Sequence, residues 1–291
     1  MIETTATAKK YAYFPGCSLE GSSAEYDQSV RAVFARFGIE FEEIPGWNCC
    51  GSSSAHNVNH ELALALSLRN LALAEPQGLD VVAPCASCYN RLKVAETSVA
   101  ENPELRKKLG NIIEMGFSGE ITTLNALDLV ENLAPETVRE KAILKLTGLK
   151  VVCYYGCLTV RPPKKLKAAN PDNPTSLDNL MELLGSEPKF WTYKTDCCGA
   201  GHSMARPDIV KTLVGKLHEM AREAGAEAIV TACPMCFTNI DMRQDVAKCI
   251  KLPVFYFTEL MALAMGAEEV KGWFQKHLTS PFPLLQRLNL L

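Results

Sequence analysis

The sequence has few of the features that mark membrane, nucleic-acid-binding or fibrous proteins. No apolar run reaches the ~18 residues of a membrane span, and the nearest candidate, residues 254–267, is interrupted by Thr258 and Glu259. The net charge of −3 gives no basic excess for binding phosphates, and low-complexity tracts and blocks of like charge are absent. These absences exclude disordered and fibrous proteins and predict neither a nucleic-acid partner nor a membrane span.

The first ten residues also lack the hydrophobic segment of a signal peptide, so we expect a cytoplasmic protein. With 291 residues, the chain is long for one compact domain and sufficient for two. It contains 12 cysteines, which is below the density of secreted disulfide scaffolds, about 8–10%. In a reducing compartment, so many thiols indicate metal or redox chemistry.

Ten of the cysteines form one pattern that occurs twice: a single Cys, a Cys-Cys-Gly triplet and a Cys-x-x-Cys motif. The first copy contains Cys17, Cys49, Cys50, Cys85 and Cys88, and the second contains Cys157, Cys197, Cys198, Cys233 and Cys236. Corresponding positions are 140 residues apart at the first Cys and 148 apart at every later one. A single eight-residue insertion therefore relates the copies, and we interpret them as an internal duplication.

Predicted strands and helices alternate in the same order in both copies, which is typical of parallel βαβ units. We therefore predict an α/β fold of two duplicated Rossmann-like halves, residues 1–147 and 148–291, joined by a helical linker and ending in a C-terminal helical tail. The predicted linker includes a helix over residues 123–133, and the predicted second strand of the second half spans residues 189–193.

Each motif cysteine comes at the carboxyl end of a predicted strand. Because these ends lie along one edge of a parallel sheet, we expect the five thiols of each copy to meet there. The helices that begin at this edge present unpaired N–H groups and partial positive charge, which favour thiolates and anionic metal clusters.

Zinc, a redox-active dithiol, disulfides and an iron–sulfur cluster differ in how well they account for the five thiols of each copy. Structural zinc takes four tetrahedral ligands, usually two Cys-x-x-Cys pairs, whereas each copy offers one such pair, an adjacent pair and a single Cys. A thioredoxin-like dithiol would explain the motif at residues 233–236 but would leave Cys-Cys-Gly unexplained. Disulfides are disfavoured in a reducing compartment. An iron–sulfur cluster uses all five thiols, although the usual ferredoxin spacing is absent.

This spacing, repeated over nearly the whole chain, resembles the B-type subunit of heterodisulfide reductase, a family named for its cysteine-rich CCG motif. In that family each copy holds a noncubane 4Fe-4S cluster, and the two clusters face a cleft in which a disulfide is split into two thiols. The resemblance implies two such clusters, each held by the five motif cysteines of one copy. It also implies an oxidoreductase that acts on a sulfur group, with a substrate such as the coenzyme M–coenzyme B heterodisulfide.

Two clusters suit this reaction because cleavage of a disulfide takes two electrons, whereas one cluster normally passes one. The chain has no flavin-binding fingerprint and no ferredoxin-type cysteine run, so the electrons must arrive from elsewhere. The resemblance implies the partners that supply them: the small iron–sulfur subunit of the same complex, which carries cubane clusters, and its flavin-containing subunit.

Three further residues are candidates for catalysis or substrate binding. His56 and His202 closely follow the two Cys pairs and could donate a proton or contact the substrate, although a polar surface histidine is the commoner state. Arg161 precedes Pro162 at a position where family members often carry Arg or Lys. It could bind an anionic substrate group or form a surface ion pair.

Other residues have structural interpretations beside the functional ones. Gly51 and Gly199 are expected either to let amide groups approach the cluster or to be plain loop glycines. Cys153 is predicted to be a buried small hydrophobe rather than a spare thiol, and Cys249 to be structural. Gly51 and Leu158 stand where methanogen enzymes commonly have Pro and His, at positions that would line the cleft.

Three other functions remain open. One is the iron–sulfur subunit of a glycolate, lactate, succinate or fumarate oxidoreductase, which shares the Cys-Cys-Gly motif but relays electrons. Another is a relay protein in an electron-bifurcating benzoyl-CoA or methylenetetrahydrofolate reductase assembly. The non-enzyme alternative is a scaffold stabilised by zinc.

Overall fold

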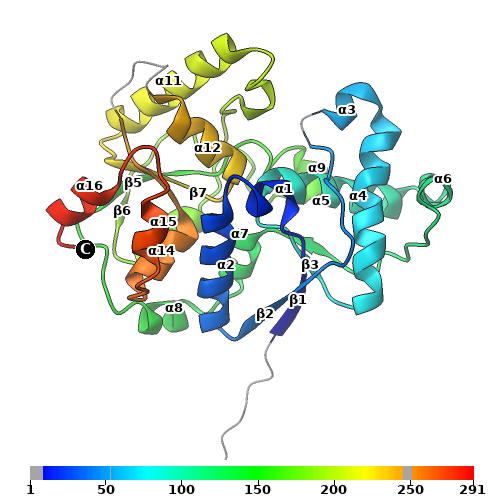
Figure 1. The fold of residues 1–291 in the computed structure, drawn as a ribbon, viewed down its shortest axis with the longest axis horizontal. Coiled ribbons are helices and arrows are strands. Elements are labelled where there is room, and N and C mark those ends of the chain that lie inside the picture. The colour runs from blue at the N-terminus through cyan, green and yellow to red at the C-terminus, as the bar shows by residue number, and fades with distance from the viewer. Residues whose placement is uncertain (1–8, 53, 245–250) are drawn as a thin grey trace, which may run out of the picture.

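Two α/β halves make up the chain, and each contains a four-stranded parallel sheet (Figure 1). The computed structural model describes residues 9–52, 54–244 and 251–291. The strand order is β2-β1-β3-β4 in the first sheet and β6-β5-β7-β8 in the second, so corresponding strands occupy the same places. The predicted duplicated α/β fold is confirmed.

The strands are short, and the central ones are buried. In the first sheet they are β1 (Lys9–Tyr13), β2 (Ile39–Glu43), β3 (Val81–Val82) and β4 (Thr123–Leu124). In the second sheet they are β5 (Lys150–Tyr154), β6 (Glu187–Pro188), β7 (Ala228–Thr231) and β8 (Val254–Tyr256). The central strands pair in the same manner, with Ala12 beside Val81 in one sheet and Val151 beside Ala228 in the other.

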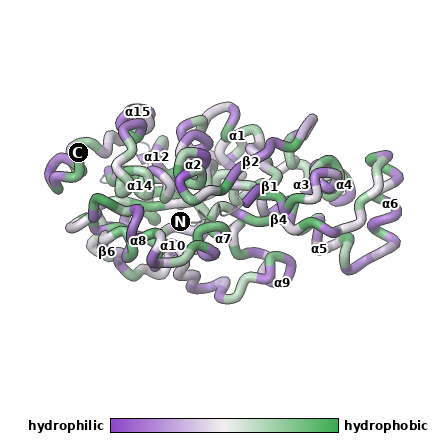
Figure 2. The backbone as a smooth tube through the Cα atoms, turned by 90° about the horizontal axis from the view of Figure 1, so that it is seen from below, coloured by the Kyte–Doolittle hydropathy of each residue, from purple (hydrophilic) through white to green (hydrophobic). Residues whose placement is uncertain are grey.

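Helices follow the strands and cover the sheets. Those of the first half are α1 (Gly16–Glu20), α2 (Ala24–Arg36), α3 (Ala55–Val58), α4 (His60–Ala74), η1 (Glu75–Gln77), α5 (Ala86–Glu101), α6 (Pro103–Ile113), α7 (Ala126–Glu131) and α8 (Pro135–Lys141). Those of the second half are α9 (Pro163–Leu166), α10 (Ser176–Leu183), η2 (Ala200–His202), α11 (Pro207–Glu223), α12 (Pro234–Met242), α14 (Phe257–Ala264), α15 (Val270–Phe274) and α16 (Phe282–Arg287). Figure 2 shows α6 at one end of the molecule and the C-terminus at the other.

The predicted second strand of the second half, residues 189–193, was placed too late. The observed strand β6 spans Glu187–Pro188 and pairs only with β5 at the edge of the sheet. The Lys189 N–H still donates to the Val151 carbonyl at 2.6 Å, and after it the Trp191 indole N–H donates to the Cys153 carbonyl at 2.9 Å. The aromatic character of this segment therefore reflects packing rather than an extended strand.

The linker was predicted to be helical, but it contributes the fourth strand of the first sheet. Within the predicted helix 123–133, Thr123 and Leu124 form β4 and pair with Val81 and Val82. A capping box between Asn125 and Asp128 then starts α7. A two-residue strand has no detectable sequence period, so the pattern of the following helix obscured it.

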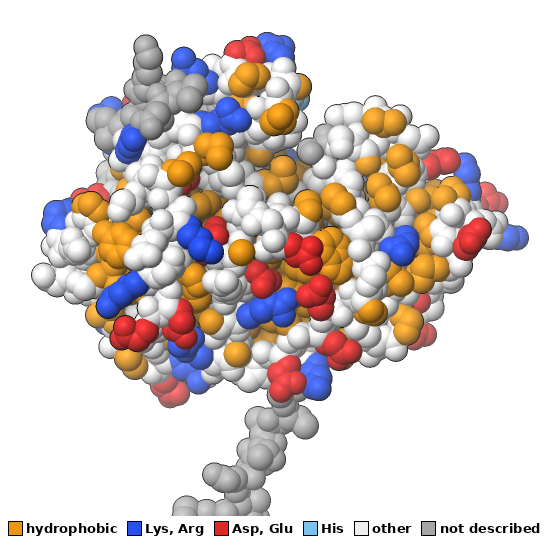
Figure 3. All heavy atoms as spheres, in the orientation of Figure 1, with side chains coloured by type: hydrophobic (Ala, Val, Ile, Leu, Met, Phe, Trp, Pro, Cys, Tyr) orange, Lys and Arg blue, Asp and Glu red, His pale blue; other side chains and the backbone are white. Residues whose placement is uncertain are grey.

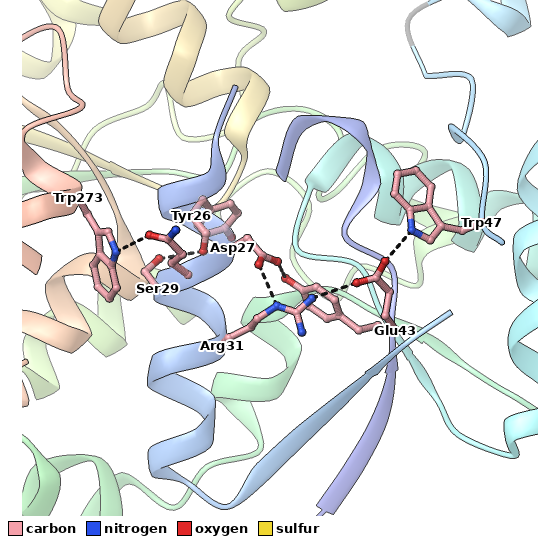
Figure 4. Close-up of polar contacts among 9 residues, drawn as sticks. Tyr26, Asp27, Ser29, Arg31, Glu43, Trp47 and Trp273 are labelled. Atoms are coloured by element: carbon pink, nitrogen blue, oxygen red, sulfur yellow. Dashed lines mark hydrogen bonds and ion pairs between the residues drawn. The ribbon is translucent and has the colours of Figure 1, made fainter. Parts of the chain in front are cut away.

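One helix of each half packs against a helix of the other half. Helix α14, which follows β8, packs on α2, and its counterpart α7, which follows β4, packs on α10. Figure 4 shows Trp273 of α15 approaching α2, where its indole N–H donates to Gln28 at 2.9 Å. The C-terminal segment folds back on the protein and buries Phe274 and Leu285. Within the described residues, no helix is both long and apolar enough to cross a bilayer.

Candidate metal centre

The sheet edges bring the motif cysteines to equivalent places in the two halves. Cys17 lies in α1, directly after β1, and Cys157 follows β5. Cys85 and Cys233 are the N-cap residues of α5 and α12, which begin after β3 and β7. The two Cys-Cys pairs follow the outer strands β2 and β6. All ten motif cysteines therefore lie at the carboxyl ends of strands, as a ligand set at one edge of each sheet requires.

In the first half, the sulfur atoms lie close together in contacting pairs. Cys17 Sγ is 4.0 Å from Cys49 Sγ, and Cys50 Sγ is 3.5 Å from Cys88 Sγ. Cys49 is hydrogen-bonded to Cys50, and Cys85 is hydrogen-bonded to Cys88 within the same Cys-x-x-Cys motif. All five sulfurs of this copy are thus within one connected group.

The second half repeats this arrangement. The Cys198 thiol donates to Cys236 Sγ at 3.6 Å, the counterpart of the pair formed by Cys50 and Cys88. Cys157 is hydrogen-bonded to Cys197, and Cys233 is hydrogen-bonded to Cys236. The two copies of the motif therefore form two equivalent sulfur groups.

The two sulfur groups approach each other at Cys85 and Cys233, where the interaction of the two thiols raises the pKa of Cys85 and helps to lower that of Cys233. The fully buried Tyr26 hydroxyl reinforces this junction: it donates to the Ala232 carbonyl at 2.9 Å and lies 3.4 Å from the Pro84 carbonyl. These carbonyls belong to the residues that precede the two contacting cysteines. Tyr26 therefore holds together the starts of both Cys-x-x-Cys motifs.

A second polar network steadies the segment before the first Cys pair (Figure 4). Arg31 of α2 bonds Asp27 at 2.8 Å and reaches Glu43 of β2 at 3.5 Å. The other oxygen of Glu43 accepts a hydrogen bond from the Trp47 indole at 3.1 Å. Because Trp47 stands two residues before Cys49, this network ties the first Cys pair to the sheet.

Within the thiol pairs, one member is set to lose its proton. Hydrogen bonds from the Cys49 and Cys88 thiols lower the pKa of Cys50 to about 3, and the contact with Cys50 raises the pKa of Cys49. In the second half, the Cys157 thiol and the Gly199 N–H lower the pKa of Cys197 to about 6. The thiolate is the form of cysteine that binds metal, so the arrangement favours metal binding.

Two glycines that the sequence analysis overlooked pack directly against the sulfurs. Gly16 and Gly156 precede Cys17 and Cys157 and have φ values of +68° and +73°. A Cβ at Gly16 would lie 2.8 Å from Cys88 Sγ, and one at Gly156 would lie 3.1 Å from Cys236 Sγ. The repeated Gly-Cys dipeptide was the available signal, because only glycine combines this backbone conformation with so close an approach.

The glycines of the two Cys-Cys-Gly triplets also have left-handed backbones, with φ of +72° at Gly51 and +79° at Gly199. The Gly199 N–H donates to Cys197 Sγ at 3.2 Å, and the Gly51 N–H is likewise bonded to Cys49. An added Cβ at Gly51 would lie 2.8 Å from Ala55 and Leu66. Both glycines therefore turn the chain so that an amide faces a sulfur.

A cavity of about 300 Å³ opens beside the sulfur group of the second half and is lined by residues of both halves, although no motif cysteine of the first half is among them. The first half contributes α3, the loop before it and α5, and the second half contributes the segments around its five cysteines, all of which line the cavity. Figure 3 shows the surface hollowed between the lobe that carries α11 and the lobe that carries α3 and α4. The cavity walls include Leu158, one of the two positions that depart from the methanogen pattern.

The histidines and Arg161 occupy different environments. His56 and His202 are exposed side chains on opposite walls of this cavity, so the structure brings them together. Arg161 is 56% exposed, is 3.7 Å from Asp172, and is not among the cavity-lining residues. A cation that the sequence analysis missed, Arg91 of α5, lines the cavity instead. The sequence feature that pointed to Arg91 was its position three residues after Cys88, about one helical turn from a motif cysteine.

Two cysteines lie outside the pattern. Cys153 is fully buried in β5, and burial raises the pKa of its thiol well above the usual range. This position agrees with the expected small hydrophobe. Cys249, expected to be structural, lies outside the described residues.

The residues present fit a cluster held by thiolates. Within residues 9–52, 54–244 and 251–291, no three metal-binding side chains converge on one point as the ligands of a single ion would. The eleven cysteines among them are all free thiols, and ten of them form two groups of five. Gly16 and Gly156 pack so closely against these groups that a side chain at either position would contact a sulfur. This donor set suits a multinuclear iron–sulfur cluster in each half.

Comparisons with known proteins agree with this chemistry. Residues 11–93 and 151–241, more than half of the chain, match the CCG cysteine-rich domain. A protein of Wolinella succinogenes, described as an 8-methylmenaquinol:fumarate reductase membrane anchor subunit, is 32% identical over 89% of this chain and 93% of its own. A protein of Archaeoglobus profundus, described as like the B-type subunit of heterodisulfide reductase, is 29% identical over 90% of this chain and 92% of its own.

Two further relatives extend these comparisons. The B-type subunit of a ferredoxin/F420H2-dependent CoB-CoM heterodisulfide reductase of Methanosarcina acetivorans is 26% identical over 88% of this chain and 89% of its own. A crystal structure of a hypothetical protein from Helicobacter pylori superimposes with a TM-score of 0.72 over 94% of this chain and 52% of that chain. At 14% identity, this last similarity concerns the fold alone.

Proposed function

The chain belongs to the CCG cysteine-rich domain family, and we propose that it is the iron–sulfur subunit of a heterodisulfide reductase-type complex. Its reaction would be the reduction of a disulfide to two thiols, which consumes two electrons and two protons. The proposal rests on one observation above the others: the contact between Cys85 and Cys233 joins two equivalent sulfur groups beside one cavity.

Each group of five cysteines would hold one noncubane 4Fe-4S cluster, and this cofactor supplies one-electron transfer when bound. Neighbouring residues would set the surroundings of the substrate. Tyr155, Leu158 and Met235 line the cavity and provide an apolar wall for a disulfide. The disulfide would therefore lie in a pocket that restricts access of water to the reacting sulfurs.

The two product thiols need two protons, and His56 and His202 are the cavity residues proposed to contact the product sulfurs, with His202 and solvent as the proton sources. A hydrogen bond of 3.2 Å joins the Arg91 guanidinium to Nδ1 of His56. Because a guanidinium can only donate, Nδ1 accepts, and the ring proton is held on Nε2. His56 is thereby held in the neutral form, and burial and Arg91 also lower its pKa, so it would give a product sulfur a hydrogen bond from Nε2–H rather than a proton.

The electrons would come from partner subunits, as the names of the heterodisulfide reductase relatives imply for those proteins. We propose two partners: the small iron–sulfur subunit with cubane clusters and the flavin-containing subunit of the same complex. The eleven described cysteines are free thiols, which supports the proposed cytoplasmic location.

A second candidate function is electron relay without thiol chemistry. It is favoured by the 32% identity to the fumarate reductase subunit over 89% of this chain. In such a protein, the same clusters would pass electrons onward, and the cavity would bind no disulfide. Arg161 would also lose its proposed role in substrate binding.

Electron paramagnetic resonance of the anaerobically purified protein separates these functions. Oxidised protein is mixed with small thiols, and the cluster signal is recorded before and after. Disulfide chemistry predicts a signal that changes in proportion to the bound thiol and reverts when the thiol is removed. A signal that is identical at all thiol concentrations would identify a relay protein. Finding zinc without acid-labile sulfide would exclude both functions.

A further inference from the structure

Apart from the five cysteines of the second half, the titratable side chains on the wall of the shared cavity include no carboxylate. No Asp or Glu lines it, whereas Arg91, His56 and His202 do. The remaining lining residues are small residues and apolar or neutral polar side chains. The part of the wall around Arg91 therefore favours a ligand group that carries negative charge.

Arg91 is the permanent cation among these residues, and its bonding is incomplete. One terminal nitrogen bonds His56 Nδ1 at 3.2 Å, but the Nε atom is buried and has no hydrogen-bond partner among the described residues. No described carboxylate lies within ion-pair distance of its guanidinium. A guanidinium carries five N–H donors, and one of its terminal nitrogens bonds His56, so terminal donors remain for an anionic group that enters the cavity.

The second half has no counterpart to this charge. Asn239 stands three residues after Cys236, as Arg91 stands three residues after Cys88. Its amide nitrogen donates to the Cys198 carbonyl, and its oxygen accepts bonds from Ser203 and Arg243. Asn239 is therefore neutral and bonded within its own half, so the two sides of the cavity differ in charge although the sulfur groups are equivalent.

We infer that Arg91, held by His56, binds an acidic group on one side of an unsymmetrical disulfide and on the corresponding thiol product. A carboxylate, sulfonate or phosphate would bind the guanidinium on the first half, and the other side of the disulfide would lie against Met235 and Leu158. The inference rests on the proposed disulfide reductase function. It adds the charge class of the substrate and its orientation.

Calorimetric titration of the anaerobic, cluster-containing protein with two thiols of equal length tests the inference without turnover. The probes are 3-mercaptopropionate, which is anionic, and 3-mercapto-1-propanol, which is neutral. We expect the anion to bind at least about tenfold more tightly, which corresponds to about 1.4 kcal/mol. Propionate, which has no thiol, should compete with the anionic probe and leave the neutral probe unaffected.

Substitutions then assign the preference to a residue. Arg91→Gln should abolish it, and Arg91→Lys should retain part of it because the charge remains while the forked geometry is lost. The matched control is Arg139→Gln, at an exposed site on α8 where Arg139 pairs with Glu136, and it should keep the full preference. Iron content is measured for each variant, and if Arg91→Gln loses iron, propionate competition in the unaltered protein decides.

The outcomes separate this inference from the function on which it rests. If neither thiol binds the unaltered protein, the proposed function fails. If both bind with equal affinity, or if propionate does not compete, thiol binding stands and the role of Arg91 is refuted. If Arg161→Gln abolishes the preference while Arg91→Gln keeps it, the acidic group binds at Arg161.

Discussion

The thiols of Cys85 and Cys233 lie close enough to shift each other's pKa, although they belong to different copies of the repeat. Each caps the helix that follows the same strand of its sheet, and the Tyr26 hydroxyl lies between the carbonyls that precede them. The two sulfur groups are therefore neighbours rather than independent sites. This junction explains why the duplication would be useful: it puts two one-electron centres beside one substrate.

Loss of a ligand should affect mainly its own half. We expect Cys17→Ala and Cys157→Ala each to lower the iron content by about half, because each removes a thiolate from one group of five. Iron and acid-labile sulfide per chain are the measurement. Cys153→Ala is the matched control, since Cys153 is fully buried outside both groups. If it lowered iron as much as Cys17→Ala, the assignment of ligands would be wrong.

The glycines before the first cysteine of each copy should be intolerant of a side chain. Gly16→Ala would put a methyl group 2.8 Å from Cys88 Sγ, so we expect it to lower iron binding in the first half. Gly38→Ala is the control: φ there is +70°, but no atom lies within 4 Å of the added carbon. Gly38→Ala therefore tests backbone strain without crowding. Equal iron loss in both variants would show that the contact with sulfur is unimportant.

The buried pair formed by Glu259 and His277 should stabilise the second half. Their side chains are fully buried and 2.9 Å apart. Burial lowers the pKa of His277, but the Glu259 carboxylate outweighs it and the pKa is raised. The contribution of the charged pair to the free energy of unfolding is therefore complete below the ordinary histidine pKa, about 6.5. It is lost as the pH rises through the raised pKa of His277 in the folded protein.

Removal of one partner leaves the other buried without its bond, so Glu259→Gln should cost about 3–5 kcal/mol, measured as a fall in melting temperature at pH 6. Glu268→Gln removes an exposed pair with Lys271 and should cost less than about 1 kcal/mol. A similar loss in the two variants would contradict the role assigned to the buried pair.

Asp128 should make stability depend on pH in the acidic range. Burial raises the pKa of this carboxyl to about 6, although the Asn125 N–H opposes the shift. Because the folded state favours the protonated form, the stabilisation is complete below about pH 4 and is lost as the pH rises through 6. Asp128→Asn should therefore raise the free energy of unfolding at pH 8 by about 1–3 kcal/mol, seen as a higher melting temperature than that of the unaltered protein. At pH 4 it should bring no gain in stability. A gain that is the same at both pH values would refute this origin.

Much of the fold followed from the cysteine repeat, because motif cysteines after three of the four strands of each sheet indicate repeated βαβ units and the edge where the thiols gather. The short strands β4 and β6 were mislocated, since two residues carry no periodicity and Trp191 bonds β5 through its side chain. Tyr26 and Arg91 were missed for another reason: their roles depend on tertiary contacts, with Ala232 of the other half for Tyr26 and with His56 for Arg91.

Metal analysis of the anaerobically purified protein tests the central claim most directly. Two thiolate-bound 4Fe-4S clusters predict about eight iron atoms and about eight acid-labile sulfides per chain, with no stoichiometric zinc. One or two zinc ions per chain without labile sulfide would contradict the account, because the ten thiols would then hold single ions and have no electrons to transfer.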